Sequence, residues 1–69
     1  MPEEWTGQLL GRMHNARVTR KEIADEMGVA RPYISMILSG KRNPRRGRER
    51  MEAAMEAILK RREERKELT

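Results

Sequence analysis

The sequence predicts an all-α protein, a single small domain of four or five helices of which the last is long. Two short stretches, at 19–27 and 31–38, each carry apolar residues at helical spacing and are bracketed by residues that start and stop helices. Apolar residues then recur between Met51 and Leu59 at the spacing i, i+3, i+4, i+7, i+8, which is the period of an α-helix. The chain has 69 residues, so we expect one domain with a small core.

The first predicted helix starts at residues 2–4 and ends near Asn15. Proline suits the first helical position, and the two glutamates that follow it favour the positive end of the helix dipole. Gly7 and Gly11 each weaken a helix by about 1 kcal/mol relative to alanine, and a close approach by another helix would explain them. The apolar residues of this helix share one face: Trp5, Leu9 and Met13. We expect the tryptophan in the core or at its edge.

The second predicted helix, 19–27, begins with a capping box. The hydroxyl of Thr19 and the carboxylate of Glu22 can each accept a hydrogen bond from a backbone amide that has no partner in the first turn. Val18 precedes the box and can fix the angle at which the chain enters the helix. Gly28 ends the helix, because glycine adopts the left-handed conformation of a helix terminus without strain.

The third predicted helix, 31–38, opens with Arg31 and Pro32 after a short turn. Proline in a first turn loses no hydrogen bond, because its amide would have no helical partner there. Ala24, four residues before Gly28, is the small residue needed where two helices cross at a large angle. Leu38 shares the inward face of the third helix with Ile34 and Ile37. The apolar residues that fill the space between the two helices are Ile23, Met27, Val29, Ile34 and Ile37. This spacing indicates a helix-turn-helix motif, and a helical hairpin without a role in DNA binding is the alternative.

The net charge of +5 is concentrated in one decapeptide that follows the motif. Residues 41–50 contain six of the 16 Lys and Arg residues and one of the 11 acidic residues, so they carry the whole excess. A basic patch beside a helix-turn-helix motif indicates a protein that binds a polyanion. A solvated face or flexible linker is the alternative interpretation.

The last predicted helix covers about residues 47–66, and its apolar face ends at Leu59. This face can close the core over the other helices, bind a second subunit, or do both with Met55 and Leu59 shared between the two roles, and the pattern leaves these alternatives open. The candidate dimer-interface residues are Met51, Met55, Ile58 and Leu59. The tail, 60–69, begins with eight consecutive charged residues, so we expect it to extend as a solvated helix or to fray, without adding to the core.

The motif resembles the Cro/CI-type regulators of the XRE family, which occur in phages and bacteria. The resemblance covers 18–29 and 34–44, where Gly-x-x-x-x-x-Ile-Ser at 28–35 and Gly-Lys-Arg-x-Pro at 40–44 occur together. It implies a lambda-repressor-like DNA-binding domain whose third helix lies in the major groove. It also implies a dimer on a near-palindromic operator.

Three features of the motif depart from the family's usual pattern. Arg20 stands where the family often has glutamine, and Ala30 stands where a Ser or Thr cap often starts the third helix. The exposed face of the third helix is sparse in amides, so no operator base can be inferred from an Asn or Gln pairing with adenine. We also expect no effector or dimerisation domain, and in this respect the chain resembles a small Cro-type or prophage regulator.

Helical geometry predicts which residues contact DNA. With Ile34 and Ile37 inward, four residues of the third helix turn outward as candidate base contacts: Arg31, Pro32, Ser35 and Met36. Arg31 is the first candidate because its guanidinium can bridge O6 and N7 of guanine. The candidate phosphate contacts come from both motif helices and the basic loop: Arg20, Lys21, Tyr33, Lys41, Arg42, Asn43, Arg45 and Arg46. For Tyr33, packing in the core is the equal alternative.

These observations predict a sequence-specific transcription regulator that binds double-stranded DNA. We expect a repressor of phage or mobile-element type that forms a homodimer, at least on DNA. An antitoxin or anti-repressor that binds a protein partner through the last helix is the alternative. We expect it in the cytoplasm of a bacterium, associated with the nucleoid and encoded by the bacterium or a phage.

The composition argues against an enzyme or a cofactor protein. The chain has no cysteine and one histidine, which leaves no disulfide and no basis for a metal cluster. No apolar run approaches the length of a membrane span, and the acidic residues at 3–4 are unlike a signal peptide. We therefore expect no catalytic residue, metal, cofactor, small-molecule ligand or membrane partner.

Overall fold

The computed structural model describes residues 4–68, with side chains as far as residue 66. In this range the chain forms four α-helices and no strand: α1 (Glu4–Ala16), α2 (Arg20–Met27), α3 (Arg31–Leu38) and α4 (Gly47–Leu68). The predicted all-α class with a long last helix is confirmed. Pro2 and Glu3, which we expected to start the first helix, lie outside the described residues.

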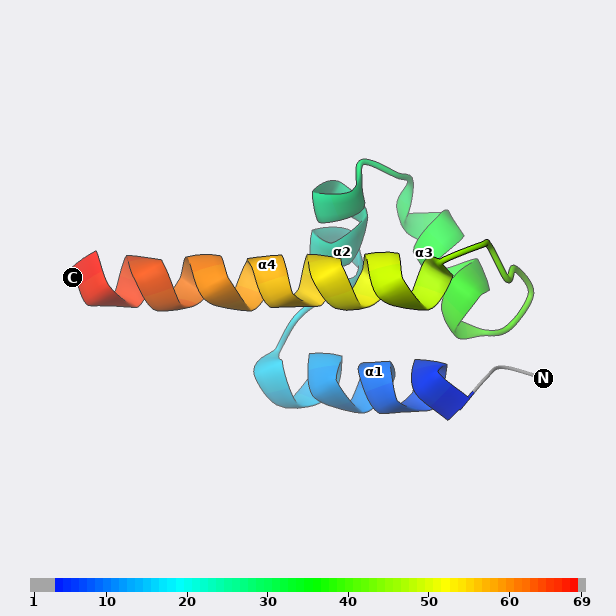
Figure 1. Cartoon of the computed structure of the whole chain (residues 1–69), viewed down its shortest axis with the longest axis horizontal. Coiled ribbons are helices and arrows are strands. Elements are labelled where there is room, and N and C mark those ends of the chain that lie inside the picture. Colours follow the sequence, from blue (N-terminus) through cyan, green and yellow to red (C-terminus); the bar gives the residue numbers. More distant parts are fainter. Residues whose placement is uncertain (1–3, 69) are drawn as a thin grey trace.

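The long helix α4 spans most of the length of the molecule, and the other helices gather beside its N-terminal half (Figure 1). α1 contacts α3 and α4, and α2 contacts the same two helices from another side. The C-terminal part of α4 extends beyond the other helices, which gives the molecule its elongated shape of 42 × 22 × 17 Å. No helix among the described residues combines the length and apolarity needed to cross a membrane.

One apolar core lies between the four helices, and its burial is the main force that holds them together. Trp5 is partly buried and packs against this core, so the expectation that it lies in the core or at its edge is confirmed. Met27 and Val29, at the turn between α2 and α3, pack against the core in the same way. The buried apolar residues are Leu9, Met13, Val18, Ile23, Ala24, Ile34, Ile37, Leu38, Met51, Ala54, Met55 and Ile58.

The apolar face of α4 closes the core, so three of the four candidate dimer-interface residues are buried within a single chain. Met51, Met55 and Ile58 are 0%, 1% and 3% exposed within a single chain. Since their side chains are already covered by the other helices, they have no free surface for a second subunit or for a protein partner. Leu59 is half-buried, and it alone of the four candidates keeps a partly open side chain.

The start and end of α2 confirm the signals found in the sequence. The Glu22 amide donates to Thr19 Oγ1 at 3.1 Å, and the Thr19 amide donates to Glu22 Oε1 at 3.0 Å, which is the predicted capping box. Gly28 has a φ of +71°, and its amide and that of Val29 bind the last carbonyls of the helix. The turn into α3 is therefore determined by local hydrogen bonds.

The end of α1 uses the same geometry with an arginine in place of glycine. Arg17 has a φ of +56°, and its amide donates to the His14 carbonyl at 3.2 Å. The Val18 amide donates to the Met13 carbonyl at 2.8 Å, and these two apolar residues are both buried. This is the Schellman ending of a helix, and the packed pair holds the arginine in a conformation that glycine adopts more easily.

Gly7 and Gly11 do not mark a close approach between helices. A Cβ atom built on either glycine has no neighbour within 4 Å, so both residues face open space. The expectation that another helix packs on them is wrong. The two glycines therefore weaken α1 without a packing contact in return.

We predict that Gly11→Ala raises the free energy of unfolding by about 0.5–1 kcal/mol, because alanine loses less backbone entropy in a helix. Urea denaturation followed by circular dichroism measures the change. Gly28→Ala is the matched comparison and is expected to destabilise the protein, because its positive φ strains any side chain. Equal effects of the same sign at both positions would contradict this account.

The charged end of α4 is helical to Leu68, and two of its arginines bind α2. Arg61 forms an ion pair with Glu26 at 2.5 Å. Arg62 binds Glu22 at 2.8 Å, together with two backbone carbonyls between α1 and α2. Its described side chains, 60–66, add no apolar residue to the core, but polar contacts hold the first turn of this segment against α2.

Candidate nucleic-acid interface

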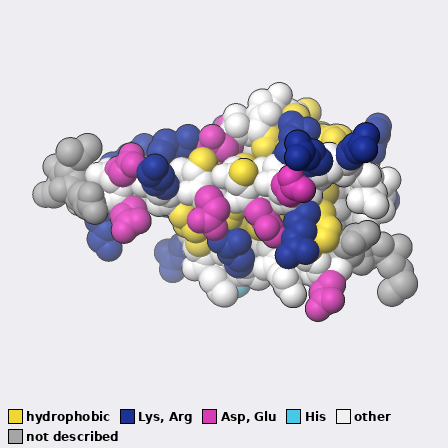
Figure 2. All heavy atoms as spheres, in the orientation of Figure 1, with side chains coloured by type: hydrophobic (Ala, Val, Ile, Leu, Met, Phe, Trp, Pro, Cys, Tyr) yellow, Lys and Arg dark blue, Asp and Glu magenta, His cyan; other side chains and the backbone are white. Residues whose placement is uncertain are grey.

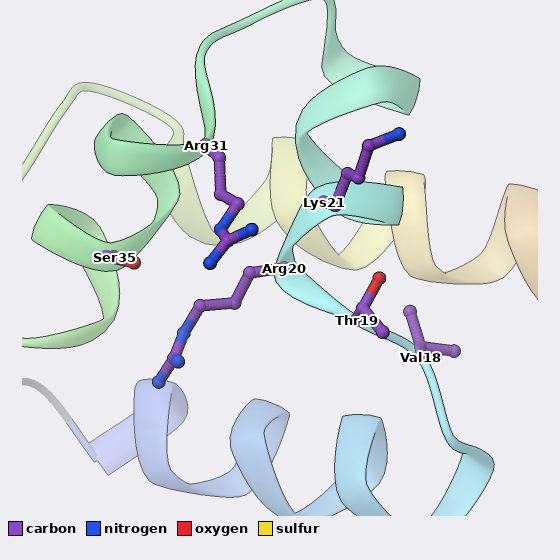
Figure 3. A pocket seen from close by; sticks show the side chains of 6 residues that line it. All are labelled: Val18, Thr19, Arg20, Lys21, Arg31 and Ser35. Carbon is purple, nitrogen blue, oxygen red and sulfur yellow. The ribbon is translucent and has the colours of Figure 1, made fainter.

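A surface groove separates the start of α2 from α3, and we call it the α2–α3 groove. Figure 3 shows the side chains of Arg20 and Arg31 extending into this space, with the Ser35 hydroxyl facing it. Lys21 points in the opposite direction to Arg20. None of the lining residues is acidic, so the groove is a basic surface: Val18, Thr19, Arg20, Lys21, Arg31 and Ser35.

The buried face of α3 determines which of its side chains reach the surface. Ile34 is fully buried and Ile37 is 2% exposed, so this face of α3 points into the core. With 3.6 residues per turn, Arg31 and, one turn later, Ser35 lie together on one flank of this buried face. Pro32 and Met36 lie opposite to it. Arg31 is exposed and Ser35 is half-buried, and both line the groove. Ala24 of α2 is 1% exposed, as required of a small residue where two helices cross.

The other candidate contacts on α3 lie outside the lining of the groove. Pro32 is exposed, and Met36 is half-buried. Tyr33 is half-buried and packs against the core. The sequence also assigned Val18 and Thr19 only to the capping of α2, whereas both line the groove beside Arg20.

The start of α3 has no side-chain cap, as the alanine at this position indicated. Ala30 is the N-cap residue, and its side chain cannot accept a hydrogen bond from the first turn. The Tyr33 amide donates to the Ala30 carbonyl at 3.0 Å, and Pro32 has no amide hydrogen. The first turn of α3 therefore presents its positive dipole end together with the Arg31 side chain.

The basic loop, by which we mean the decapeptide 41–50 whose last residues form the start of α4, begins directly at the C-terminal end of α3. Gly40 has a φ of +84°, which turns the chain back on the helix. The amides of Lys41 and Arg42 then donate to the carbonyl of Met36 at 2.9 and 3.1 Å. These bonds keep the first two cations of the loop beside the C-terminus of α3, so basic residues lie at both ends of this helix.

Most of the cations predicted to contact DNA have no acidic partner. Lys21 pairs with Asp25 at 3.2 Å, and Arg46 pairs with Glu49 at 3.4 Å, both at exposed positions. In the part of the chain that the structure describes, five others form no ion pair: Arg20, Arg31, Lys41, Arg42 and Arg45. Their charge is therefore available to a polyanion.

The face that α4 presents has the opposite character. Figure 2 shows acidic and basic side chains interspersed along it. Arg12 pairs there with Glu56 at 2.6 Å, and Arg48 pairs with Glu52 at 2.9 Å. The charges of these pairs neutralise one another locally, whereas the five cations of the motif and the basic loop named above have no such partner among the described residues.

Glu22 connects the capping of α2 to the charged end of α4. The backbone hydrogen bond from Thr19 holds the pKa of the Glu22 carboxyl below its ordinary value of 4.5, and the guanidinium of Arg62 lowers it further. Partial burial opposes this shift. Because the pKa is lower in the folded protein, the ionised carboxylate stabilises the fold above pH 4.5, and this contribution is lost as the pH falls through the folded pKa.

We predict that Glu22→Gln flattens the dependence of stability on pH below about 4.5, as expected from linkage. Glutamine can still accept the Thr19 amide, but it cannot form the ion pair with Arg62. Thermal unfolding at a series of acidic pH values measures this dependence. Glu63→Gln, on the exposed part of α4, is the control, and an unchanged acid profile for Glu22→Gln would rule out the proposed linkage.

The described residues hold no group of three or more His, Cys, Asp or Glu side chains placed to bind a metal ion. What they do hold is a helix-turn-helix with a basic surface at both ends of its second helix, which is the arrangement of a DNA-binding protein.

A family model described as "Helix-turn-helix" matches residues 12–48, which is more than half of the chain. The chain therefore belongs to the XRE family of Cro/CI-type helix-turn-helix DNA-binding regulators. The match covers α2, α3 and most of the basic loop. Searches of curated proteins and of solved structures found no match.

Proposed function

We propose that this regulator is a sequence-specific repressor of phage or mobile-element type that reads the major groove with α3. The observation that carries the proposal is the set of unpaired cations at both ends of α3, whose inner face is buried in the core. Such a helix can enter the major groove while its flanking cations bind the two phosphate backbones. The repressor role follows the resemblance to small Cro-type regulators. It would act in the bacterial cytoplasm, at the nucleoid.

In this proposal Arg31 reads a base, because its side chain extends from the first turn of α3 and can bridge O6 and N7 of guanine. Ser35 lies one turn further on and can reach a base edge or a phosphate. Pro32 and Met36 offer apolar contacts to a thymine methyl group.

Phosphate binding is assigned to the residues around the motif. Arg20 acts from the start of α2, and the basic loop adds Lys41, Arg42, Asn43 and Arg45. Lys21 and Arg46 can join them by exchanging their exposed acidic partners for phosphate, which costs little in solvent. The Tyr33 hydroxyl is a further candidate.

The proposed assembly on DNA is a homodimer on a near-palindromic operator, with the two copies of α3 about 34 Å apart. If about five phosphates are bound per subunit, the logarithm of the affinity falls with the logarithm of the salt concentration at a slope of about −4 to −5 per subunit. Selection of bound duplexes from a random pool tests this arrangement. A two-fold symmetric consensus supports the dimer, and the absence of any consensus would reject sequence-specific binding.

We predict that Arg31→Ala weakens binding to the selected duplex by about 1–3 kcal/mol and relaxes the preference at one base pair. Arg42→Ala is predicted to weaken binding to all duplexes alike and to reduce the salt slope by about 1. Fluorescence anisotropy with matched, single-substitution and unrelated duplexes separates the two effects. The reverse pattern in the two variants would overturn the assignment of base and phosphate contacts.

A further inference from the structure

The side chain of Arg62 reaches from α4 to the link between α1 and α2. Its Nη1 donates to the Ala16 carbonyl at 2.5 Å. Its Nη2 donates to the Arg17 carbonyl at 3.0 Å and to Glu22 Oε2 at 2.8 Å. One guanidinium therefore binds the end of α1, the linking residue and the first turn of α2.

These three hydrogen bonds restrict the movement of α1 relative to α2 at the link between them, which we call the α1–α2 joint. The carbonyls of Ala16 and Arg17 lie at the C-terminal end of α1, where carbonyls lack helical partners and a cation is favoured by the helix dipole. The second carboxylate oxygen of Glu22 accepts the Thr19 amide at 3.0 Å. Arg62 is thus connected through a single carboxylate to the residue that starts α2.

The joint carries part of the α2–α3 groove. Thr19, Arg20 and Lys21 line that groove, while Arg62 is not among its lining residues. Arg62 therefore supports this part of the proposed DNA-binding surface from outside the groove. Its neighbour Arg61 binds Glu26, further along α2, so two consecutive arginines of α4 hold both halves of this helix.

We infer that Arg62 is a positioning residue for DNA binding, an inference that rests on the proposed function. Arg62 fixes the α1–α2 joint, residues 17–19. It thereby holds the first turn of α2 in the position and orientation in which Arg20 can bind a phosphate. Three of the five N–H donors of the guanidinium bind Ala16, Arg17 and Glu22, and Arg62 does not line the α2–α3 groove, so we assign it no DNA contact of its own.

The experiment compares Arg62→Ala and Arg62→Lys with the wild-type chain, at a temperature at which each variant is shown to be folded by circular dichroism. Arg65→Ala is the control, because Arg65 is exposed on the next turn of the same helix. The first readout is affinity for the selected duplex as a function of salt. The second is a double-mutant cycle with Arg20→Ala. The third is amide hydrogen exchange in the first turn of α2 without DNA.

The expected result is an affinity loss of about tenfold for Arg62→Ala, with a salt slope about 0.9 less steep, because one phosphate contact is lost. In the Arg20→Ala background the same change should have almost no further effect. Arg62→Lys should recover part of the affinity, because lysine keeps the charge but cannot bind three acceptors as a planar fork. Hydrogen exchange should accelerate in the first turn of α2 but not in α3.

Two results would overturn the inference. One is unchanged affinity and exchange in Arg62→Ala. The other is an equal affinity loss in the wild-type and Arg20→Ala backgrounds, which would mean that Arg62 contacts DNA itself or acts on the whole fold. If the wild-type chain binds no duplex, the proposed function fails. The exchange measurement then still decides whether Arg62 fixes the α1–α2 joint.

Discussion

Replacement of Ile34 by alanine is expected to leave much of the protein unfolded. Ile34 is 0% exposed and lies on the face of α3 that points into the core. Truncation of a buried isoleucine removes apolar contacts and leaves a cavity, at a cost of about 2–5 kcal/mol. A domain of this size has a free energy of unfolding of only about 5 kcal/mol. The cost of the substitution is therefore comparable with the total stability of the protein.

Urea denaturation followed by the helical signal in circular dichroism measures this effect. Ile34→Val is the conservative comparison and should cost about 0.5–1.5 kcal/mol, because it removes one methylene group. Ser35→Ala, at the next position of the same helix, is the control. It tests whether any substitution in α3 lowers the free energy of unfolding by a large amount. If Ile34→Ala costs less than Ile34→Val, the site is not the packed centre of the core.

Replacement of Ala24 by leucine is expected to impair both stability and DNA binding. Ala24 is 1% exposed in α2, which contacts both α3 and α4, so a larger side chain must push a helix away. Overpacking of this kind costs about 1–3 kcal/mol. Displacement of α3 relative to α2 would also separate Arg31 from Arg20, which extend into the same groove from the two helices.

The control for this variant is Ala53→Leu, at an exposed position of α4, which should change stability by no more than about 0.5 kcal/mol. Stability is measured by thermal unfolding, and DNA affinity is measured well below the unfolding midpoint of each variant. Normal DNA affinity in a folded Ala24→Leu variant would show that the spacing of α2 and α3 does not determine binding.

The boundaries of the motif helices could be predicted because their signals are local. The capping box joins Thr19 to Glu22, and the ending of α2 joins Gly28 to residues three and four positions earlier. Such bonds form within about one helical turn, so both partners lie within a few residues of each other in the sequence. The left-handed ending of α1 was not predicted, because Arg17 is not a residue type that marks such a position.

The role of the apolar face of α4 could not be decided from its period. Helical spacing shows that Met51, Met55 and Ile58 share a face, but it says nothing about what covers that face. Only the packing of α1 and α2 against α4 shows that these residues are enclosed within one chain. The two glycines of α1 were misread for the same reason, since a close approach depends on where another helix lies.

The contacts of Arg62 were missed because their partners are far away in the chain. Its carbonyl acceptors are 46 and 45 residues away, and Glu22 is 40 residues away. One signal could have indicated the pairing: three consecutive cations at 60–62 and three acids in the second helix, at 22, 25 and 26. Complementary charge alone does not give the register of two helices, so the pairing needed the structure.

The sequence by itself determined the helices of the motif, the inward face of α3 and the excess of positive charge that follows it, because each depends on neighbours within a few residues. It also carried enough of the family's pattern to identify an XRE-type regulator. Only the tertiary structure decided that α4 closes the core, that Arg20 and Arg31 share one groove, and that Arg62 holds the α1–α2 joint. These features depend on the relative positions of whole helices, which are set by packing between residues far apart in the chain.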